Sequence, residues 1–139
     1  MEKIVYDKKH LTIKINLQSR SVYLEWKAFA GSSDYREGLN TALSLVKTHK
    51  LENWLANLRN MKAIRQEDQD WTNRDWFPQL AHSSLKKMAI VVSEDIFNQL
   101  AVDNIMQKSN GVIRFDTQYF NSDQSAQQWL GGVEKKMTV

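Results

Sequence analysis

Along residues 1–30 the apolar positions alternate with polar ones, which is the two-residue period of a half-buried β-strand. Leu11–Leu17 and Val22–Ala28 both alternate in this way, and the polar residues 18–21 between them favour a turn. This arrangement predicts an antiparallel hairpin with one face turned inward. Ile4–Tyr6 is a possible short edge strand in front of the hairpin.

Two later segments are mainly apolar and have the length of a strand. They are Trp54–Leu58 and Met88–Val92. Such apolar runs are typical of parallel strands that are covered on both faces. We therefore expect these strands to be neighbours, parallel to each other, in the interior of a sheet. A last strand is expected within Val112–Phe120.

Between these strands the apolar spacing changes to the 3.6-residue period of helices. Tyr35–Val46 carries one apolar stripe, and Ser33 is the expected N-cap of that helix. A second helix is expected to open near Glu67, and a third to follow Ser93 as its N-cap. The inward face of this third helix is expected to carry Ile96, Phe97, Leu100, Ile105 and Met106.

Together these elements predict an α/β fold. An N-terminal antiparallel hairpin leads into a mixed, largely parallel sheet covered by about four helices, joined by right-handed crossovers. The last helix is expected to be short and to end at Gly131-Gly132. A chain of 139 residues fits one domain, expected over residues 1–132, with residues 133–139 as a flexible tail.

Composition excludes several classes of function. The chain has no cysteine, which rules out disulfides, thiol catalysis and cysteine-based zinc sites and suits a reducing cytoplasm. The net charge of +3 is dispersed along the chain, whereas nucleic-acid binders cluster their basic residues, so no nucleic-acid partner is expected. No apolar run approaches the roughly 20 residues of a transmembrane helix, and no signal peptide is expected. We expect a cytoplasmic protein.

The sequence also lacks the usual marks of catalysis and cofactor binding. The three histidines have no partner at metal-ligand spacing, and no phosphate-binding glycine motif occurs, so neither a metal nor a cofactor is expected. The densest acidic group, Glu67, Asp68, Asp70 and Asp75, has two interpretations. These residues are either paired carboxylates for acid–base chemistry or a solvated helix face. The second interpretation is favoured, and with it a protein that is not an enzyme.

The candidate binding edge follows the strand Trp54–Leu58, because α/β sheets bind ligands where a strand ends and the next helix begins. The site residues expected there are Arg59, Arg65, Asp68, Trp71 and Trp76. Trp71 points about 180° away from Leu80 on a straight helix. Either Pro78 kinks the helix and both faces pack inward, or Trp71 is a partly exposed binding anchor.

Several short sequence segments resemble those of one known group of proteins. They are Tyr23-Leu24-Glu25-Trp26-Lys27, Trp54-Leu55-Ala56-Asn57-Leu58-Arg59-Asn60-Met61 and Asp75-Trp76-Phe77-Pro78. With the order of elements, they resemble uncharacterised bacterial members of the STAS/SpoIIAA-like superfamily, which is related to lipid-binding CRAL-TRIO (Sec14-like) domains. Regulators in that superfamily carry a phosphorylatable serine at the start of the helix that follows the matching strand. Here no serine or threonine occurs between Arg59 and Trp71, which argues against a phospho-switch.

The resemblance implies a regulatory or protein-interaction module with a protein partner, or one that self-associates. Its Sec14-like relatives imply an alternative, a binder of a small apolar ligand or lipid.

Overall fold

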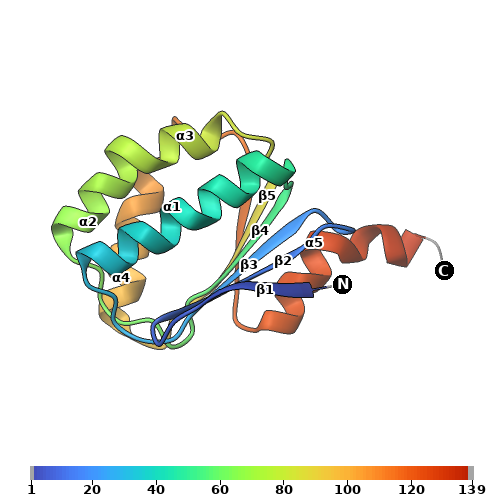
Figure 1. The fold of residues 1–139 in the computed structure, drawn as a ribbon. Helices are drawn as coiled ribbons and strands as arrows, with labels where there is room; N and C mark the ends of the chain where they lie inside the picture. Colours follow the sequence, from blue (N-terminus) through green and yellow to red (C-terminus); the bar gives the residue numbers. More distant parts are fainter. Residues whose placement is uncertain (1, 138–139) are drawn as a thin grey trace.

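The computed structural model describes residues 2–137, and the side chains of residues 2–131. Six strands form one mixed sheet with helices on both faces (Figure 1). The strands are β1 (Glu2–Asp7), β2 (Leu11–Asn16), β3 (Ser21–Trp26), β4 (Asn53–Asn57), β5 (Lys87–Val91) and β6 (Asp116–Phe120). The helices are α1 (Ser32–His49), α2 (Gln66–Trp71), the π-helix η1 (Thr72–Trp76), α3 (Phe77–Ala81), α4 (Ile96–Lys108) and α5 (Asp123–Met137).

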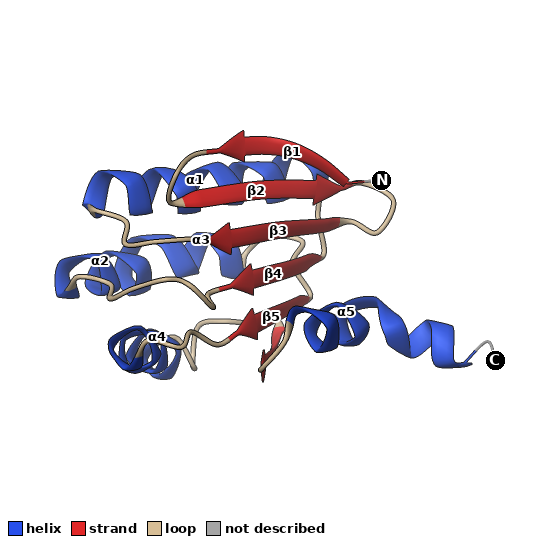
Figure 2. Cartoon of the chain, turned by 90° about the horizontal axis from the view of Figure 1, so that it is seen from below, coloured by secondary structure: helices blue, strands red, loops and turns tan. Residues whose placement is uncertain are grey.

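The strands lie in the sheet in the same order as in the chain (Figure 2). β1, β2 and β3 are antiparallel, whereas β3, β4, β5 and β6 are parallel to one another. The predicted α/β fold with an N-terminal antiparallel hairpin is thus confirmed. Trp54–Leu58 and Met88–Val92 correspond to β4 and β5, which are parallel neighbours in the interior of the sheet, as predicted.

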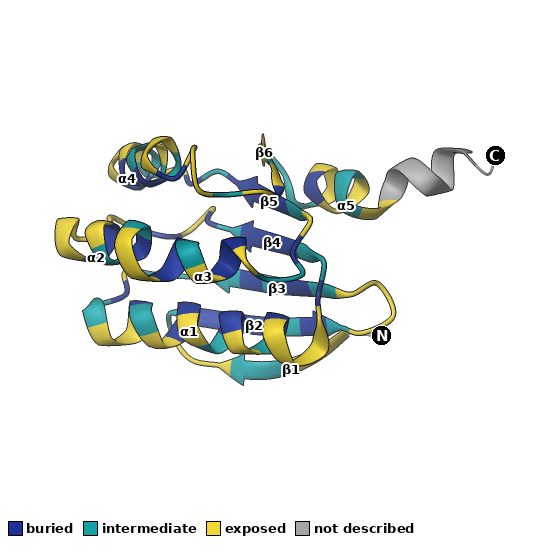
Figure 3. Ribbon diagram, turned by 90° about the horizontal axis from the view of Figure 1, so that it is seen from above, coloured by how far each residue is buried: buried dark blue, intermediate teal, exposed yellow. Residues whose placement is uncertain are grey.

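One face of the sheet is covered by α1 to α4 and the other by α5 (Figure 1). The larger core lies on the first face, where β4 and β5 are buried along most of their length and every second residue of β3 is buried (Figure 3). Gly38 brings α1 close to the sheet, because a Cβ there would lie only 2.5 Å from Cδ2 of the buried Leu11. On the opposite face Ala126 of α5 packs against Leu55, Ala89 and Val91.

Pro78 lies in the first turn of α3, directly after the π-helical turn. A π-bulge accommodates about one extra residue and so rotates the following helix by about 100°. The angle between Trp71 and Leu80 falls from about 180° to about 80°. Trp76 and Phe77 are therefore core residues, whereas Trp71 is partly buried and packs against the edge of the same core, between the two interpretations given for it.

Two helix ends differ from the predictions. The N-cap of α1 is Gly31 rather than Ser33. α5 does not end at Gly131-Gly132 but continues to Met137, because Gly131 does not adopt the left-handed conformation of a helix stop. Residues 133–137 of the predicted tail are thus helical, and residues 138–139 lie outside the described residues.

Candidate functional site

Two of the predicted site residues, Arg59 and Arg65, lie on the surface after β4. Arg59 forms an ion pair with Glu94, with 3.4 Å between Nη2 and Oε2. Arg65 is the N-cap of α2, and its guanidinium lies 5.5 Å from the centre of the exposed Phe29 ring. Both arginines are accessible for polar contacts with a partner.

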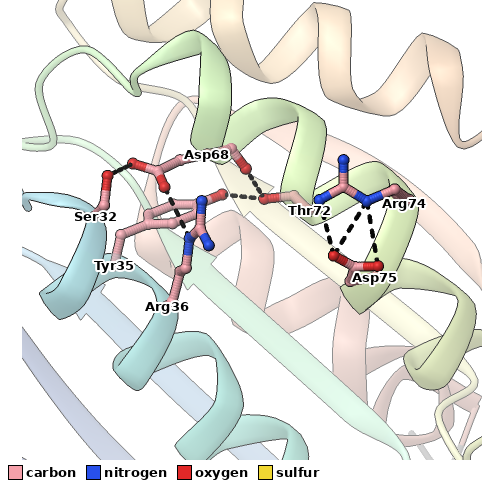
Figure 4. A network of polar contacts seen from close by, with 7 residues as sticks. All are labelled: Ser32, Tyr35, Arg36, Asp68, Thr72, Arg74 and Asp75. Carbon is pink, nitrogen blue, oxygen red and sulfur yellow. Dashed lines mark hydrogen bonds and ion pairs between the residues drawn. The ribbon is translucent and has the colours of Figure 1, made fainter.

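Asp68 is not at the rim of a site. Its side chain is 1% exposed and connects α2 to α1 (Figure 4). Ser32 Oγ donates a hydrogen bond to Asp68 Oδ2 over 2.8 Å, and Arg36 Nε donates to Oδ1 over 3.0 Å. Asp68 therefore pairs with an arginine of its own chain, and this contact joins α2 to α1.

A second buried contact lies beside this ion pair. Thr72 Oγ1 donates to the backbone oxygen of Asp68 over 2.6 Å, so the Tyr35 hydroxyl donates to Thr72 Oγ1 over 2.7 Å (Figure 4). Burial raises the pKa of Tyr35 and keeps its phenol neutral. Thr72 is 2% exposed, so its hydroxyl is not accessible at the surface of the folded domain.

The two tryptophans of the predicted site differ in position. Trp76 is 2% exposed, its Nε1 donates to the Leu39 carbonyl over 3.0 Å, and its ring packs against Trp54. It is a core residue that lies beneath the surface, and it lines an apolar cavity in which a ligand, rather than a protein partner, could contact it. Trp71 is half-buried: its ring centre lies 6.2 Å from that of Tyr35, and the Arg36 guanidinium lies 5.2 Å above it.

The acidic residues near α2 do not converge on one point. Asp68 is buried in its ion pair, whereas Asp70 accepts a hydrogen bond from Gln66, and Asp75 pairs with Arg74 over 3.0 Å. Among the described residues no group of three His, Asp or Glu side chains is placed to hold a metal ion. These acidic side chains are therefore not arranged as the paired carboxylates that acid–base chemistry would require.

A small apolar cavity lies between the sheet and the helices. Its volume is about 80 Å³, and its walls include Trp54, Trp76, Phe77, Met88 and Met106. An engineered apolar cavity of about 150 Å³ is known to bind benzene. The cavity of this domain is smaller than that one.

A larger hollow lies between α5 and the strands β2 and β3. It has a volume of about 450 Å³ and a partly polar lining. Tyr23 on its floor donates a hydrogen bond to Asp123 over 2.8 Å, and Lys14 lies 5.6 Å from the Tyr23 ring centre.

The feature that the sequence did not predict is the outer face of α4. Ile96, Phe97 and Leu100 are 58%, 68% and 60% exposed. The prediction that these three residues lie on the inward face of the helix is wrong. Ala101 and Ile105 are buried together with the polar Asn98 and Ser109, which occupy core-facing positions. We refer to Ile96, Phe97 and Leu100 as the α4 apolar face.

The residues at the start of α4 explain in part why the helix is rotated relative to the prediction, with Ile96, Phe97 and Leu100 facing outward. The N-cap is Asp95 rather than Ser93, and its side chain accepts hydrogen bonds from the backbone N–H groups of Phe97 and Asn98. Ser93 instead donates to the Met61 carbonyl over 2.8 Å. A signal was present in the sequence, because apolar residues occur on every side of this helix, and only one side can face the sheet.

The loop after β4 is in contact with the start of α4. The Glu94 N–H donates to the Arg59 carbonyl over 3.2 Å, and Asn98 Nδ2 donates to the Lys62 carbonyl over 2.8 Å. The loop predicted as the binding edge therefore lies against the start of α4, the helix that carries the α4 apolar face. Arg59 lies on the surface of this loop, whereas Asp68 and Trp76 lie beneath the surface.

Within the described residues, every helix is too short or too polar to cross a membrane. No protein-family model, no curated protein and no solved structure matches this chain.

Proposed function

We propose that this chain is a non-enzymatic protein-interaction or regulatory module of STAS/SpoIIAA-like type, with the α4 apolar face as the centre of its partner surface. The observation that carries the proposal is the exposure of three large apolar side chains within five residues of one helix, each more than half exposed. Contiguous apolar patches on single proteins commonly mark sites of interaction.

The surroundings of the face support a protein partner. Exposed charged residues lie close to the apolar centre in the chain: Glu94 precedes α4 and pairs with Arg59, and Asp103 follows Leu100 on the same helix. An apolar centre with a polar rim is the usual composition of protein interfaces. Phe97 supplies the large exposed side chain that interfaces use as an anchor.

Three further observations favour regulation or binding over catalysis and agree with a cytoplasmic location. The acids around α2 are paired or apart rather than convergent. The turn before α2 has no hydroxyl to phosphorylate, so control by that route is not part of the proposal. The absence of cysteine suits a reducing compartment.

Native mass spectrometry of protein purified from its own host tests the proposal. Wild-type protein is compared with a variant carrying Ile96→Ser, Phe97→Ser and Leu100→Ser. Leu17→Ser is the matched control, because Leu17 is an exposed apolar residue in the turn after β2. We expect a complex, either with another protein or with a second copy, for the wild type and the control but not for the α4 variant. Identical species for all three proteins would contradict the proposal.

A small apolar ligand is the second candidate, and the apolar cavity in the core is the observation that favours it. It ranks second because the cavity, at about 80 Å³, is smaller than the cavity of about 150 Å³ that is known to bind benzene. The same spectra test it, because a retained ligand adds a defined mass to the wild-type monomer. The α4 variant should retain that mass, since none of its three changed residues lines the cavity.

A further inference from the structure

The connections that lead into the amino ends of β3, β4, β5 and β6 gather basic residues that are far apart in the sequence. Residues 17–20 precede β3, residues 47–52 form the end of α1 and the connection to β4, residues 82–86 precede β5, and residues 109–115 precede β6. These connections hold five basic residues and one acidic residue, Glu52. The basic residues, which we call the amino-end cluster, are Arg20, Lys47, Lys50, Lys86 and Arg114.

Backbone hydrogen bonds hold these connections side by side. The Asn53 N–H donates to the Arg20 carbonyl over 3.0 Å. The Lys86 N–H donates to the Glu52 carbonyl over 2.8 Å, and the Lys86 carbonyl accepts from the Asp116 N–H over 2.9 Å. Neighbouring strands are about 4.8 Å apart, so the cluster forms a row across the amino ends of the parallel strands. Figure 2 shows α4 beside the carboxyl ends of these strands, so the row and the α4 apolar face lie at opposite ends of the sheet.

Most of the positive charge of the cluster is not neutralised. Glu52 Oε2 lies 3.4 Å from Arg20 Nη1 and 3.7 Å from Lys86 Nζ, so one carboxylate is shared by two basic residues. The other three members are exposed and form no ion pair with a described residue. Five basic residues and one acidic residue give the connections a net charge of +4, whereas the whole chain has +3, so the rest of the chain has −1. The first residues of β5 and β6, Lys87 and Asp116, balance each other.

Helix electrostatics explain only part of the cluster. Lys47 and Lys50 lie at the C-terminal end of α1, where basic residues complement the helix dipole. Arg20, Lys86 and Arg114 lie in connections between elements, where no such local effect applies. A row of like charges that is not neutralised produces a positive potential, and such a surface attracts an anionic partner.

The residues around the cluster favour a membrane surface over a nucleic acid or a protein. The exposed aromatic side chains of the described residues, on which the bases of a single strand would stack, are Phe29, Phe97 and Tyr119, and none of them belongs to these connections. The exposed apolar residues of the connections are Leu17 and Val112, which are 55% and 38% exposed. They lie in the first and last connections of the row, with basic residues between them, whereas a protein interface usually has an apolar centre and a polar rim.

We propose that the amino-end cluster binds the surface of a membrane that contains anionic phospholipids. The basic side chains contact the anionic headgroups, and Leu17 and Val112 enter the interface beside them. Clusters of about four to eight lysine and arginine residues bind such surfaces. This inference goes beyond the proposed function, because the α4 apolar face at the other end of the sheet stays free for a protein partner while the membrane is bound.

Co-sedimentation with lipid vesicles tests the proposal. The wild-type protein is mixed with vesicles of phosphatidylcholine alone, or with vesicles in which about one third of the lipid is phosphatidylserine. We expect binding to the anionic vesicles only, and we expect that binding to be largely lost when the salt is raised from about 50 to about 500 mM, because salt screens exposed charges. These two results need no variant, so they do not depend on the folding of an altered protein.

Two triple variants with the same net charge locate the binding surface. Lys47→Gln, Lys86→Gln and Arg114→Gln remove three charges of the cluster and should weaken binding by about a hundredfold, since each basic residue near an anionic surface contributes about fivefold. The matched control replaces the exposed Lys8, Lys9 and Lys62, which lie outside the cluster, with glutamine and should bind as the wild type does.

Three outcomes would overturn the proposal. The first is equal binding to both kinds of vesicle, or to neither. The second is an equal loss of binding in the two triple variants, which would mean that net charge alone attracts the protein. The third is tighter binding to a short DNA duplex than to the anionic vesicles at the same salt concentration, which would assign the cluster to a nucleic acid.

Discussion

Phe97 and Phe77 form a matched pair that tests where the core of this domain ends. Both are phenylalanines in helices, but Phe97 is 68% exposed on α4, whereas Phe77 is 4% exposed. The Phe77 ring centre lies 5.1 Å from that of Trp76 and 6.4 Å from that of Phe115. Truncating each to alanine should therefore have very different effects on the free energy of unfolding.

The magnitudes follow from the burial of each ring. Complete burial of a phenylalanine side chain stabilises a protein by about 1.5–3 kcal/mol. Only about a third of Phe97 is covered, so Phe97→Ala should lower the free energy of unfolding by at most about 1 kcal/mol. The higher helix propensity of alanine offsets part of that loss. Phe77→Ala leaves a cavity in the core and should cost about 3–5 kcal/mol.

Urea denaturation of the two variants and the wild type measures this difference. The m-value should stay the same in all three, because a change in m would mean that the folded or unfolded state itself had changed. A loss of about 3 kcal/mol or more for Phe97→Ala would refute the reasoning. It would mean that Phe97 packs in the core, as the sequence pattern of α4 suggested.

Three further predictions concern other parts of the molecule. Asp68→Ala should lower the free energy of unfolding by about 3 kcal/mol, the lower end of the range for breaking a buried pair, because Arg36 can still reach water. Asp70→Ala on the surface should change it by less than about 0.5 kcal/mol. Equal effects of the two substitutions in denaturation experiments would contradict the buried pair. Trp71→Ala should cost about 2 kcal/mol, less than a fully buried aromatic, since its ring is half-buried, and a loss of about 4 kcal/mol would assign it to the core. Burial, together with the nearby Asp123 carboxylate, raises the pKa of Tyr23 from 10.0 to about 12, so the unfolded state loses this proton first and the free energy of unfolding should fall as pH rises through that interval. Denaturation at a series of alkaline pH values should show a smaller fall for Tyr23→Phe, and an unchanged slope would contradict the assignment.

The strands could be predicted from the sequence because each has only one arrangement that buries its apolar residues. The alternation in β2 and β3 leaves a single inward face, and the apolar β4 and β5 require cover on both faces. The candidate binding edge after β4 was proposed from the general position of binding sites in α/β sheets. Arg59 was correctly expected at the surface there.

The rotation of α4 and the turn at Thr72–Trp76 could not be predicted in the same way. Apolar residues lie all around α4, so their spacing does not select which side faces the sheet, and the polar Asn98 and Ser109 take buried positions. The burial of Asp68 depends on Arg36, which lies 32 residues earlier in the chain. A π-helical turn has no reliable sequence pattern, so the extra rotation that turns Trp71 towards the core was visible only in the structure.

The most direct test of the central claim, that the α4 apolar face is the partner surface, is site-specific photo-crosslinking in the cells that produce the protein. A benzoylphenylalanine is incorporated in place of Phe97 and, as the control, in place of the exposed Leu17. Mass analysis of the adducts then identifies the partner as another protein or as a second copy of this chain. The proposal predicts a defined adduct from position 97 that is absent from position 17. No adduct from position 97, or the same adducts from both positions, would contradict it.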